Sequence, residues 1–349
     1  MGGLKTGKVP PDKLMELVFG FLGRPDPRVL VGPGIGEDAA VIDMGDASLV
    51  LAMDPITAAS RDLGWLSVHI NANDVATRGA VPKWFLCAVL LPEGSDEGEL
   101  GEIMGQMDRA AKELGVAIVG GHTEVAPGIR APIVIGMMAG ECPKGRHLST
   151  KGAKPGDRII MTKTAGIEGT AVISISYPDI LKVPADVIER SKGFLRSISV
   201  VEEALVAAGI EGVHSLHDPT EGGILGGVWE MAAASGLGAL IEAARVPIAE
   251  ETRTICESLG IDPMKLLGSG SLLISVDPRA EDELLRSLRR RGIRATGIGE
   301  MRDGAFGVKL IDSSGCLVEI RSPPRDSIYE VIELYEAASR GDCRWEGGS

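Results

Sequence analysis

Hydrophobic and polar residues follow one another in blocks that predict a mixed α/β protein. Apolar positions at helical spacing predict helices over residues 11–22, 63–77 and 100–114. Continuous or alternating apolar runs bounded by turn residues predict strands over 39–43, 48–54, 83–91, 116–119 and 131–140. The first half of the chain is therefore expected to contain a sheet covered by helices.

The same alternation continues in the second half. Helices are predicted over 185–208, 222–234, 248–259, 280–291 and 327–338, and strands over 158–162, 238–243, 271–276 and 294–299, followed by a hairpin. Residues 143–157 are rich in Gly, Lys and Pro and lack apolar periodicity. We therefore expect an N-terminal domain over 1–150, a C-terminal domain over 151–325, and a terminal helix with a polar tail over 326–349.

Composition narrows the class of protein. Of 349 residues 44% are hydrophobic but only 3% aromatic, which predicts an aliphatic core. The net charge of −13 would repel nucleic acid and anionic membranes, so neither is expected as a partner. Five scattered cysteines without a paired spacing, and no apolar run long enough to span a bilayer, predict a soluble cytoplasmic protein.

The densest chemical signal is the segment Gly-Pro-Gly-Ile-Gly-Glu-Asp-Ala-Ala at residues 32–40. Gly34 and Gly36 would let the backbone approach phosphates, and the carboxylates of Glu37 and Asp38 suit Mg²⁺. No Gly-Lys-Ser/Thr follows and the segment leads into a strand, so it is neither a Walker A nor a Rossmann motif. Taken alone, it fits a turn-rich loop with solvated acids equally well.

Further polar residues interrupt apolar elements. Asp54 is expected at the end of a strand, and Asn73 and Asp74 lie within an otherwise apolar helix. Both residue types are poor helix formers, and a buried carboxylate needs a partner such as a metal ion. These positions favour a metal-linked site.

A third signal follows the strand predicted over 116–119. Gly120 and Gly121 precede His122, Thr123 and Glu124, which gives two permissive residues and then three side chains able to bind ligand or transfer protons. His122 is a candidate general base or nucleotide contact because its ordinary pKa suits proton transfer near neutrality. The alternative is a structural histidine.

A fourth signal is His-Asp-Pro-Thr-Glu-Gly-Gly at residues 217–223, which places Asp218 before a helix opened by glycine. The N–H groups of such a helix terminus form an anion site, and the acid also suits an N-cap. Asp218, His122 and Glu124 are the candidate catalytic residues.

In chain order, these motifs and Lys-Pro-Gly-Asp-Arg at residues 154–158 resemble the aminoimidazole ribonucleotide synthetase-like (PurM-like) superfamily. Its members include that purine enzyme, thiamine-monophosphate kinase, selenophosphate synthetase and the hydrogenase-maturation protein HypE. The resemblance covers roughly residues 5–325, and it rests on Asn-Asp-Val-Ala-Thr-Arg-Gly-Ala at 73–80 as much as on the glycine loop.

The resemblance implies a two-domain fold in which the N-terminal sheet joins that of a second copy into a barrel, with an α/β sandwich as C-terminal domain. It also implies ATP and Mg²⁺ as cofactors. The metal-binding acids correspond to Glu37, Asp38, Asp54 and Asp74, and Lys8 to a mobile arm over the phosphates.

The nucleotide loop of the superfamily corresponds to residues 120–123, with Asn73 beside the acids. His122 replaces the aspartate of the thiamine-monophosphate kinases. The segment Asp-Pro-Thr-Glu-Gly-Gly at 218–223 resembles the Asp-Ala-Thr-Arg-Gly-Gly of the HypE type, with Glu221 in place of arginine. In that branch ATP activates a carbamoyl group on the cysteine of a Pro-Arg-Ile-Cys ending, whereas here Cys343 lies outside any such motif.

The leading hypothesis is an ATP- and Mg²⁺-dependent enzyme, a homodimer, that phosphorylates an oxygen of a carbonyl, carbamoyl or phosphate group on a small molecule or protein, with hydrogenase maturation as one setting. A thiamine-monophosphate kinase-like phosphotransferase is the alternative enzyme. A non-catalytic nucleotide-binding regulator is the alternative from another class, and Glu221 and the unusual tail favour it.

Overall fold

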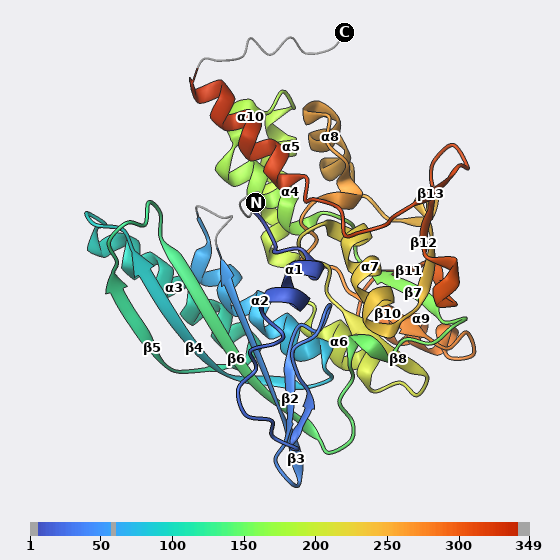
Figure 1. Cartoon of the computed structure of the whole chain (residues 1–349). Helices are drawn as coiled ribbons and strands as arrows, with labels where there is room; N and C mark the ends of the chain where they lie inside the picture. The colour runs from blue at the N-terminus through green and yellow to red at the C-terminus, as the bar shows by residue number, and fades with distance from the viewer. Residues whose placement is uncertain (1–5, 57–60, 341–349) are drawn as a thin grey trace.

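The computed structural model describes residues 6–56 and 61–340, which form two mixed β-sheets with helices packed against them (Figure 1). The helices of the first half are α1 (Pro11–Leu17), α2 (Leu63–Thr77) and α3 (Glu97–Leu114). Its strands are β1 (Val29–Val31), β2 (Ala40–Asp43), β3 (Ala47–Ile56), β4 (Val81–Leu91), β5 (Ala117–Val125) and β6 (Ile133–Pro143). The predicted mixed α/β class is confirmed.

The second half contains more helices. They are α4 (Ile167–Ser176), α5 (Ala185–Lys192), α6 (Val201–Ala208), α7 (Gly223–Ser235), α8 (Glu250–Leu259), α9 (Glu281–Arg290) and α10 (Ile328–Arg340), with short 3-10 helices that include η1 (Thr150–Gly152), η3 (Gly193–Ser197) and η4 (Ala243–Arg245). Its strands are β7 (Arg158–Thr162), β8 (Val213–His217), β9 (Gly238–Glu242), β10 (Leu273–Val276), β11 (Ala295–Arg302), β12 (Val308–Ile311) and β13 (Leu317–Glu319).

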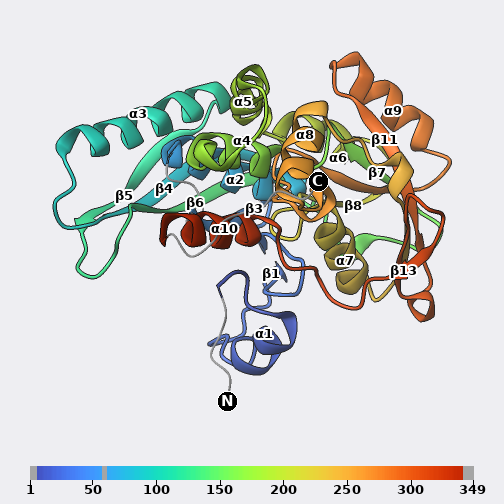
Figure 2. The same ribbon diagram turned by 90° about the horizontal axis from the view of Figure 1, so that it is seen from above.

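The two sheets lie side by side with helix α2 between them (Figure 2). Within the described residues the first sheet has the order β1-β2-β3-β6-β4-β5 and the second the order β13-β12-β9-β11-β7-β10-β8. Neighbours are antiparallel except for the parallel pairs β4–β5 and β9–β12. Parallel neighbours need a crossover, which α3 supplies between β4 and β5.

Helix α2 is the element that both halves share. Every residue of α2 except Trp65 is buried, because the helix packs on the first sheet on one side and on the second half on the other. A helix buried all round has no polar face, so its sequence reads as apolar with small and polar residues interspersed. Its polar side chains are consequently held between the two halves of the protein.

Among the residues that the structure describes, no helix covers one face of the first sheet. Alternate residues of β3, β4 and β6 face α2 and α3 and are buried, whereas the intervening ones, such as Leu49, Leu86 and Ile135, are only partly buried. Met53 on this face is 63% exposed. The predicted barrel with a second copy stays a prediction.

The helix predicted over 185–208 is wrong as a single element. Two shorter helices, α5 and α6, are separated by η3 and by residues 198–200. The amide of Asn73 bonds to Ile198 O at 2.9 Å and to Val200 N at 2.8 Å, and the indole N–H of Trp65 donates to Leu195 O at 3.0 Å. These contacts with α2 hold the connection in a non-helical course.

The strand predicted over 116–119 continues as β5 to Val125, so residues 120–124 lie in a strand and not in a turn. Gly121 allows the close pairing with β4, since a Cβ there would lie 2.2 Å from Cys87 O. Asp54 likewise lies inside β3, which extends to Ile56. Strands β1 and β8 were not predicted, and α1 ends at Leu17, with Met15 and Leu17 exposed.

Candidate active site

Four aspartates from different elements form an acidic cluster that we call the acid cluster: Asp38, Asp54, Asp74 and Asp218. Asp38 precedes β2, Asp54 lies in β3, Asp74 in α2, and Asp218 directly follows β8. Asp38, Asp54 and Asp218 each lie near enough to Asp74 to raise its pKa, and Asp38 also raises the pKa of Asp54 and Asp218. Three predicted metal ligands and one predicted catalytic residue are thus brought together by the fold.

Burial dominates the electrostatics of the acid cluster. It raises the pKa of Asp74 well above the usual range, with Asp218, Asp54 and Asp38 adding to the effect. Burial and Asp38 raise the pKa of Asp218 to about 7, and burial raises that of Asp54 to about 6 although Lys8 opposes it. Both carboxylate oxygens of Asp218 are buried without a hydrogen-bond partner among the described residues. Such an arrangement calls for a cation.

Three cationic side chains border the acid cluster. His217 lies between Asp38 and Glu230, with Nδ1 2.9 Å from Asp38 Oδ2 and Nε2 3.0 Å from Glu230 Oε2. Burial by itself lowers the pKa of His217, but the two carboxylates outweigh burial and raise that pKa to about 10. The imidazole is therefore a charged bridge at neutral pH.

Arg78, at the C-terminal end of α2, has a fully buried side chain. Its guanidinium donates to Glu37 at 2.8 Å, to Asp38 at 2.7 Å and to the hydroxyl of Thr150 at 2.8 Å. Glu37 also accepts from the hydroxyl of Ser149 at 2.5 Å. The predicted ligand Glu37 therefore points to the start of η1 and to Arg78, and its role as a metal ligand stays a prediction.

Lys8 reaches the same region from the N-terminal segment. Its Nζ forms an ion pair with Glu230 at 2.9 Å, and its backbone N–H donates to Glu221 at 2.8 Å. Burial opposes its charge, but Glu230, Asp38 and Asp54 raise its pKa. The predicted role of Lys8 over the phosphates of a nucleotide stays a prediction, and Glu221 anchors the segment.

The glycine loop serves close packing at this site. Gly36 has a φ of 73°, and a Cβ there would lie 3.0 Å from Glu230 O on α7. At Gly34 a Cβ would lie 3.3 Å from Glu37 Cγ. Asn73, predicted as a nucleotide contact, uses both ends of its amide on the backbone of residues 198 and 200. Asn73 thus joins the two halves behind the acid cluster.

His122 and Glu124 lie away from the acid cluster. They face each other on the exposed edge strand β5, with His122 Nε2 3.0 Å from Glu124 Oε2 and side chains that are 68% and 48% exposed. The strand register puts Gly121 opposite Cys87, Cys87 opposite Gly136, and Gly136 opposite Asp54. Three strand spacings, about 14 Å, therefore separate Asp54 from Gly121. Within one chain, His122, Thr123 and Glu124 do not join Asp218.

Sequence reasoning missed three residues of the site: Arg78, His217 and Glu230. Arg78 and His217 lie inside motifs that were recognised. A search of those motifs for positively charged residues that could balance the acids would have identified both. Glu230 lies in the middle of α7, and no local pattern distinguishes it from a solvated helix residue.

No group of three or more His, Cys, Asp or Glu side chains among the described residues is arranged closely enough to hold a metal ion by itself. Magnesium in phosphate sites commonly takes only one or two carboxylates, with water and substrate oxygens completing the shell. The unpaired oxygens of Asp218 and the buried carboxyl of Asp74 suit such a site. No helix among the described residues has the length and apolar character needed to cross a membrane.

Comparison with known proteins gives consistent likenesses over most of the chain. Residues 36–142 match the N-terminal domain, and residues 154–311 the C-terminal domain, of AIR synthase related protein. The chain is 32% identical to the carbamoyl dehydratase HypE of Cupriavidus necator over 289 residues. The matched region covers 79% of this chain and 80% of that protein.

Solved structures show the same fold. A structure of a HypE–HypF complex superposes with a TM-score of 0.73 at 27% identity, covering 89% of this chain and 99% of that chain. A HypE structure in complex with ATP has a TM-score of 0.67 at 24% identity, covering 92% and 97%.

Proposed function

This chain belongs to the AIR synthase-related family, and from that premise we propose that it is an ATP- and Mg²⁺-dependent enzyme that phosphorylates an oxygen of an acceptor, with a carbamoyl group as the favoured acceptor. The similarity to carbamoyl dehydratase HypE supports the carbamoyl preference. The use of ATP is supported by the HypE structure of the same fold that was solved in complex with ATP. The setting that these relatives suggest is hydrogenase maturation.

The observation that carries the proposal is the acid cluster. Asp54, Asp74 and Asp218 have raised pKa values, so their ionised forms cost free energy unless a cation is bound. The charges of Arg78 and His217 already serve Glu37, Asp38 and Glu230, and with Lys8 they lower the pKa of Asp38. Asp54, Asp74 and Asp218 would hold Mg²⁺ together with the triphosphate oxygens. Bound there, the ion would neutralise the charge of the transferring phosphoryl group.

The residues around the acid cluster have separable roles in this reaction. Lys8 supplies a positive charge that an anionic phosphate chain can approach, and the contact of His217 with Asp38 keeps that carboxylate in place. The acceptor oxygen attacks the γ-phosphorus as the bond to the leaving ADP oxygen breaks. Because this transfer needs little covalent help, positioning and charge stabilisation by these groups supply most of the catalysis.

We further propose that the enzyme is a homodimer joined through the uncovered face of the first sheet and its edge strand β5. Every residue of β5 is exposed, including Val119 at 54% and Val125 at 58%. Long exposed edge strands with apolar side chains favour pairing with another chain. A second copy on this face would bring its own His122 and Thr123 toward nucleotide, which would explain why these residues lie apart from the acid cluster within one chain.

Among the described residues no cysteine is placed to carry the acceptor at the acid cluster. Cys87, Cys142 and Cys256 are buried, and burial raises the pKa of each thiol, while Cys316 lies at the exposed β12–β13 hairpin. Cys343 lies outside the described residues. We therefore propose that the carbamoyl or other acceptor group is presented by a separate molecule or by the segment that contains Cys343.

Steady-state ATP turnover with Mg²⁺, measured with carbamoyl phosphate, with thiamine monophosphate and without acceptor, tests the proposal. We expect acceptor-stimulated ADP release, and a loss of about 100-fold or more in kcat for Asp54→Asn and Asp218→Asn, since each removes a charge that acts on the transferring group. The exposed helix residue Asp186 provides the control, and Asp186→Asn should turn over normally.

If Asp54→Asn and Asp218→Asn fold, as judged by circular dichroism, and turn ATP over as fast as the unaltered protein, the assignment of the acid cluster as the active site is refuted. Tight ATP binding without turnover under any acceptor would replace the enzyme with the nucleotide-binding regulator. Stimulation by thiamine monophosphate alone would assign the kinase-like alternative.

A further inference from the structure

A hollow of about 570 Å³ lies where α2, α3, α5 and η3 meet. Its volume falls within the range of about 300–1,000 Å³ that is usual for small-molecule sites. Its charged lining residues are Arg61, Asp62, Glu102, Arg109, Lys192 and Arg196. Four cations and two acids give this lining a net positive charge in a chain whose net charge is −13.

The cations of this hollow come from four separate segments and outnumber its acids. Arg61 precedes α2, Arg109 lies in α3 and Arg196 in η3. Arg61 and Arg109 act electrostatically on Asp62, but none of the three arginines forms a side-chain hydrogen bond or a close ion pair with another residue that the structure describes. Lys192, the last residue of α5, pairs with Glu189 at 2.6 Å on the outside. Like charges gathered this way repel one another, and a bound anion would relieve the repulsion.

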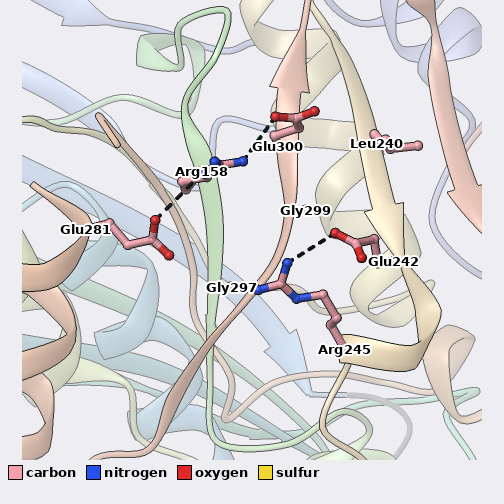
Figure 3. A pocket seen from close by; sticks show the side chains of 8 residues that line it. All are labelled: Arg158, Leu240, Glu242, Arg245, Glu281, Gly297, Gly299 and Glu300. Carbon is pink, nitrogen blue, oxygen red and sulfur yellow. Dashed lines mark hydrogen bonds and ion pairs between the residues drawn. The ribbon is translucent and has the colours of Figure 1, made fainter. Parts of the chain in front are cut away.

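A second hollow, of about 190 Å³, shows the contrast (Figure 3). It lies on β7, β9 and β11, and there Arg158 faces Glu281 and Glu300, while Arg245 pairs with Glu242 at 3.2 Å. Its guanidinium groups are thus satisfied within the protein. The three arginines of the larger hollow have no such close partner among the described residues, so that hollow is the better candidate for a ligand.

One wall of the larger hollow is apolar and rigid. Trp65 lines it beside Leu195, and the indole N–H donates to Leu195 O at 3.0 Å, which fixes the plane of the ring. The ring also packs on His69, with 4.3 Å between the ring centroids and 49° between the ring planes. A held indole next to arginines suits a ligand that combines a planar or apolar part with phosphate.

The hollow is distinct from the acid cluster. Trp65 and Asp74 are nine residues apart on α2, which at 3.6 residues per turn puts them on opposite faces of the helix and about 14 Å apart along its axis. A ligand in the hollow would therefore not touch the aspartates.

We propose that this hollow binds an organic phosphate of nucleotide size, with its phosphates on Arg109 and Arg196 and its planar part on Trp65. The site is separate from the proposed catalytic centre, and its occupation would link α3 of the first half to η3 of the second. Arginine holds phosphate oxygens with two parallel hydrogen bonds, so two arginines suffice to orient a diphosphate.

Calorimetric titration with ADP in EDTA, without divalent metal, tests the proposal, because without metal the acid cluster repels the anion. We expect saturable binding with a Kd below about 1 mM, and a loss of at least about tenfold in the double variant Arg109→Gln/Arg196→Gln. The control Arg286→Gln/Arg289→Gln, on exposed α9, makes the same change in net charge and should bind ADP as the unaltered protein does.

Equal binding by the two double variants, or no saturation at about 10 mM ADP, would overturn the proposal. Inorganic pyrophosphate should bind at least about fivefold more weakly than ADP, and Trp65→Phe should abolish the change in tryptophan fluorescence on titration. Pyrophosphate that binds as tightly as ADP would refute the role of Trp65. Asp54→Asn leaves the hollow intact. ADP binding in the hollow and ATP turnover at the acid cluster therefore test the two proposals independently, and one can fail while the other holds.

Discussion

Replacement of Arg78 by methionine tests the charge balance beneath the acid cluster. The side chain is fully buried and donates to Glu37, Asp38 and Thr150 at 2.7–2.8 Å. Methionine has similar length but no charge, so Arg78→Met leaves two carboxylates without their shared cation. Unpaired buried carboxylates destabilise the folded state because ionised oxygens lose both water and partner.

The expected loss of stability depends on the contacts that Glu37 and Asp38 keep in the variant. Removing one partner of a buried ion pair typically costs about 3–5 kcal/mol. Asp38 keeps its contact with His217, and Glu37 keeps the hydroxyl of Ser149, so we expect the lower end, about 3 kcal/mol. With an unfolding entropy of about 2.1 cal/mol/K per residue over 349 residues, this corresponds to a fall in Tm of about 4 °C.

Scanning calorimetry at neutral pH measures the effect. Arg279→Met is the matched control, since Arg279 pairs with Asp277 but its side chain is 90% exposed, and surface pairs contribute little. Arg78→Lys keeps the charge, but its single ammonium nitrogen cannot take the place of both Nη1, which bonds Glu37, and Nη2, which bonds Asp38 and Thr150, so it should fall between the two. A Tm for Arg78→Met within about 1 °C of that of the control would refute the reasoning.

Two further predictions concern residues beside the site. Asn73→Ala should lower the free energy of unfolding by about 2–3 kcal/mol, because Ile198 O and Val200 N lose their buried partner. Urea denaturation measures this change, and a decrease of less than about 0.5 kcal/mol would contradict the prediction. Burial raises the pKa of Glu168 from 4.5 to about 7, so the folded state holds its proton more tightly, and stability present below pH 4.5 is lost as pH rises through 7. Glu168→Gln should therefore gain on the unaltered protein by about 2 kcal/mol between about pH 5.5 and pH 8, and a gap in unfolding free energy that is independent of pH would contradict the shift.

The sequence motifs predicted many of the acidic residues of the site but not the cations that balance their charge. Asp38 stands out because it follows a glycine loop, Asp54 because it was expected at a strand end, and Asp74 because it interrupts an apolar helix, and the fold does bring the three together. His217 escaped selection because its charge depends on Glu230, which lies on a helix whose local sequence carries no sign of the contact. A charge state set by a distant partner is not a local property of the chain.

The sequence by itself determined where most helices and strands lie and that the core is aliphatic, because periodicity reports which side of each element is buried. Tertiary structure decided which elements meet. It made β5 an edge strand three strands from Asp54, which separates residues 120–124 from the acids, and it broke the predicted helix over 185–208 through contacts with Asn73. Strand order and long-range hydrogen bonds depend on partners far along the chain, and a local pattern of polar and apolar residues does not contain those pairings.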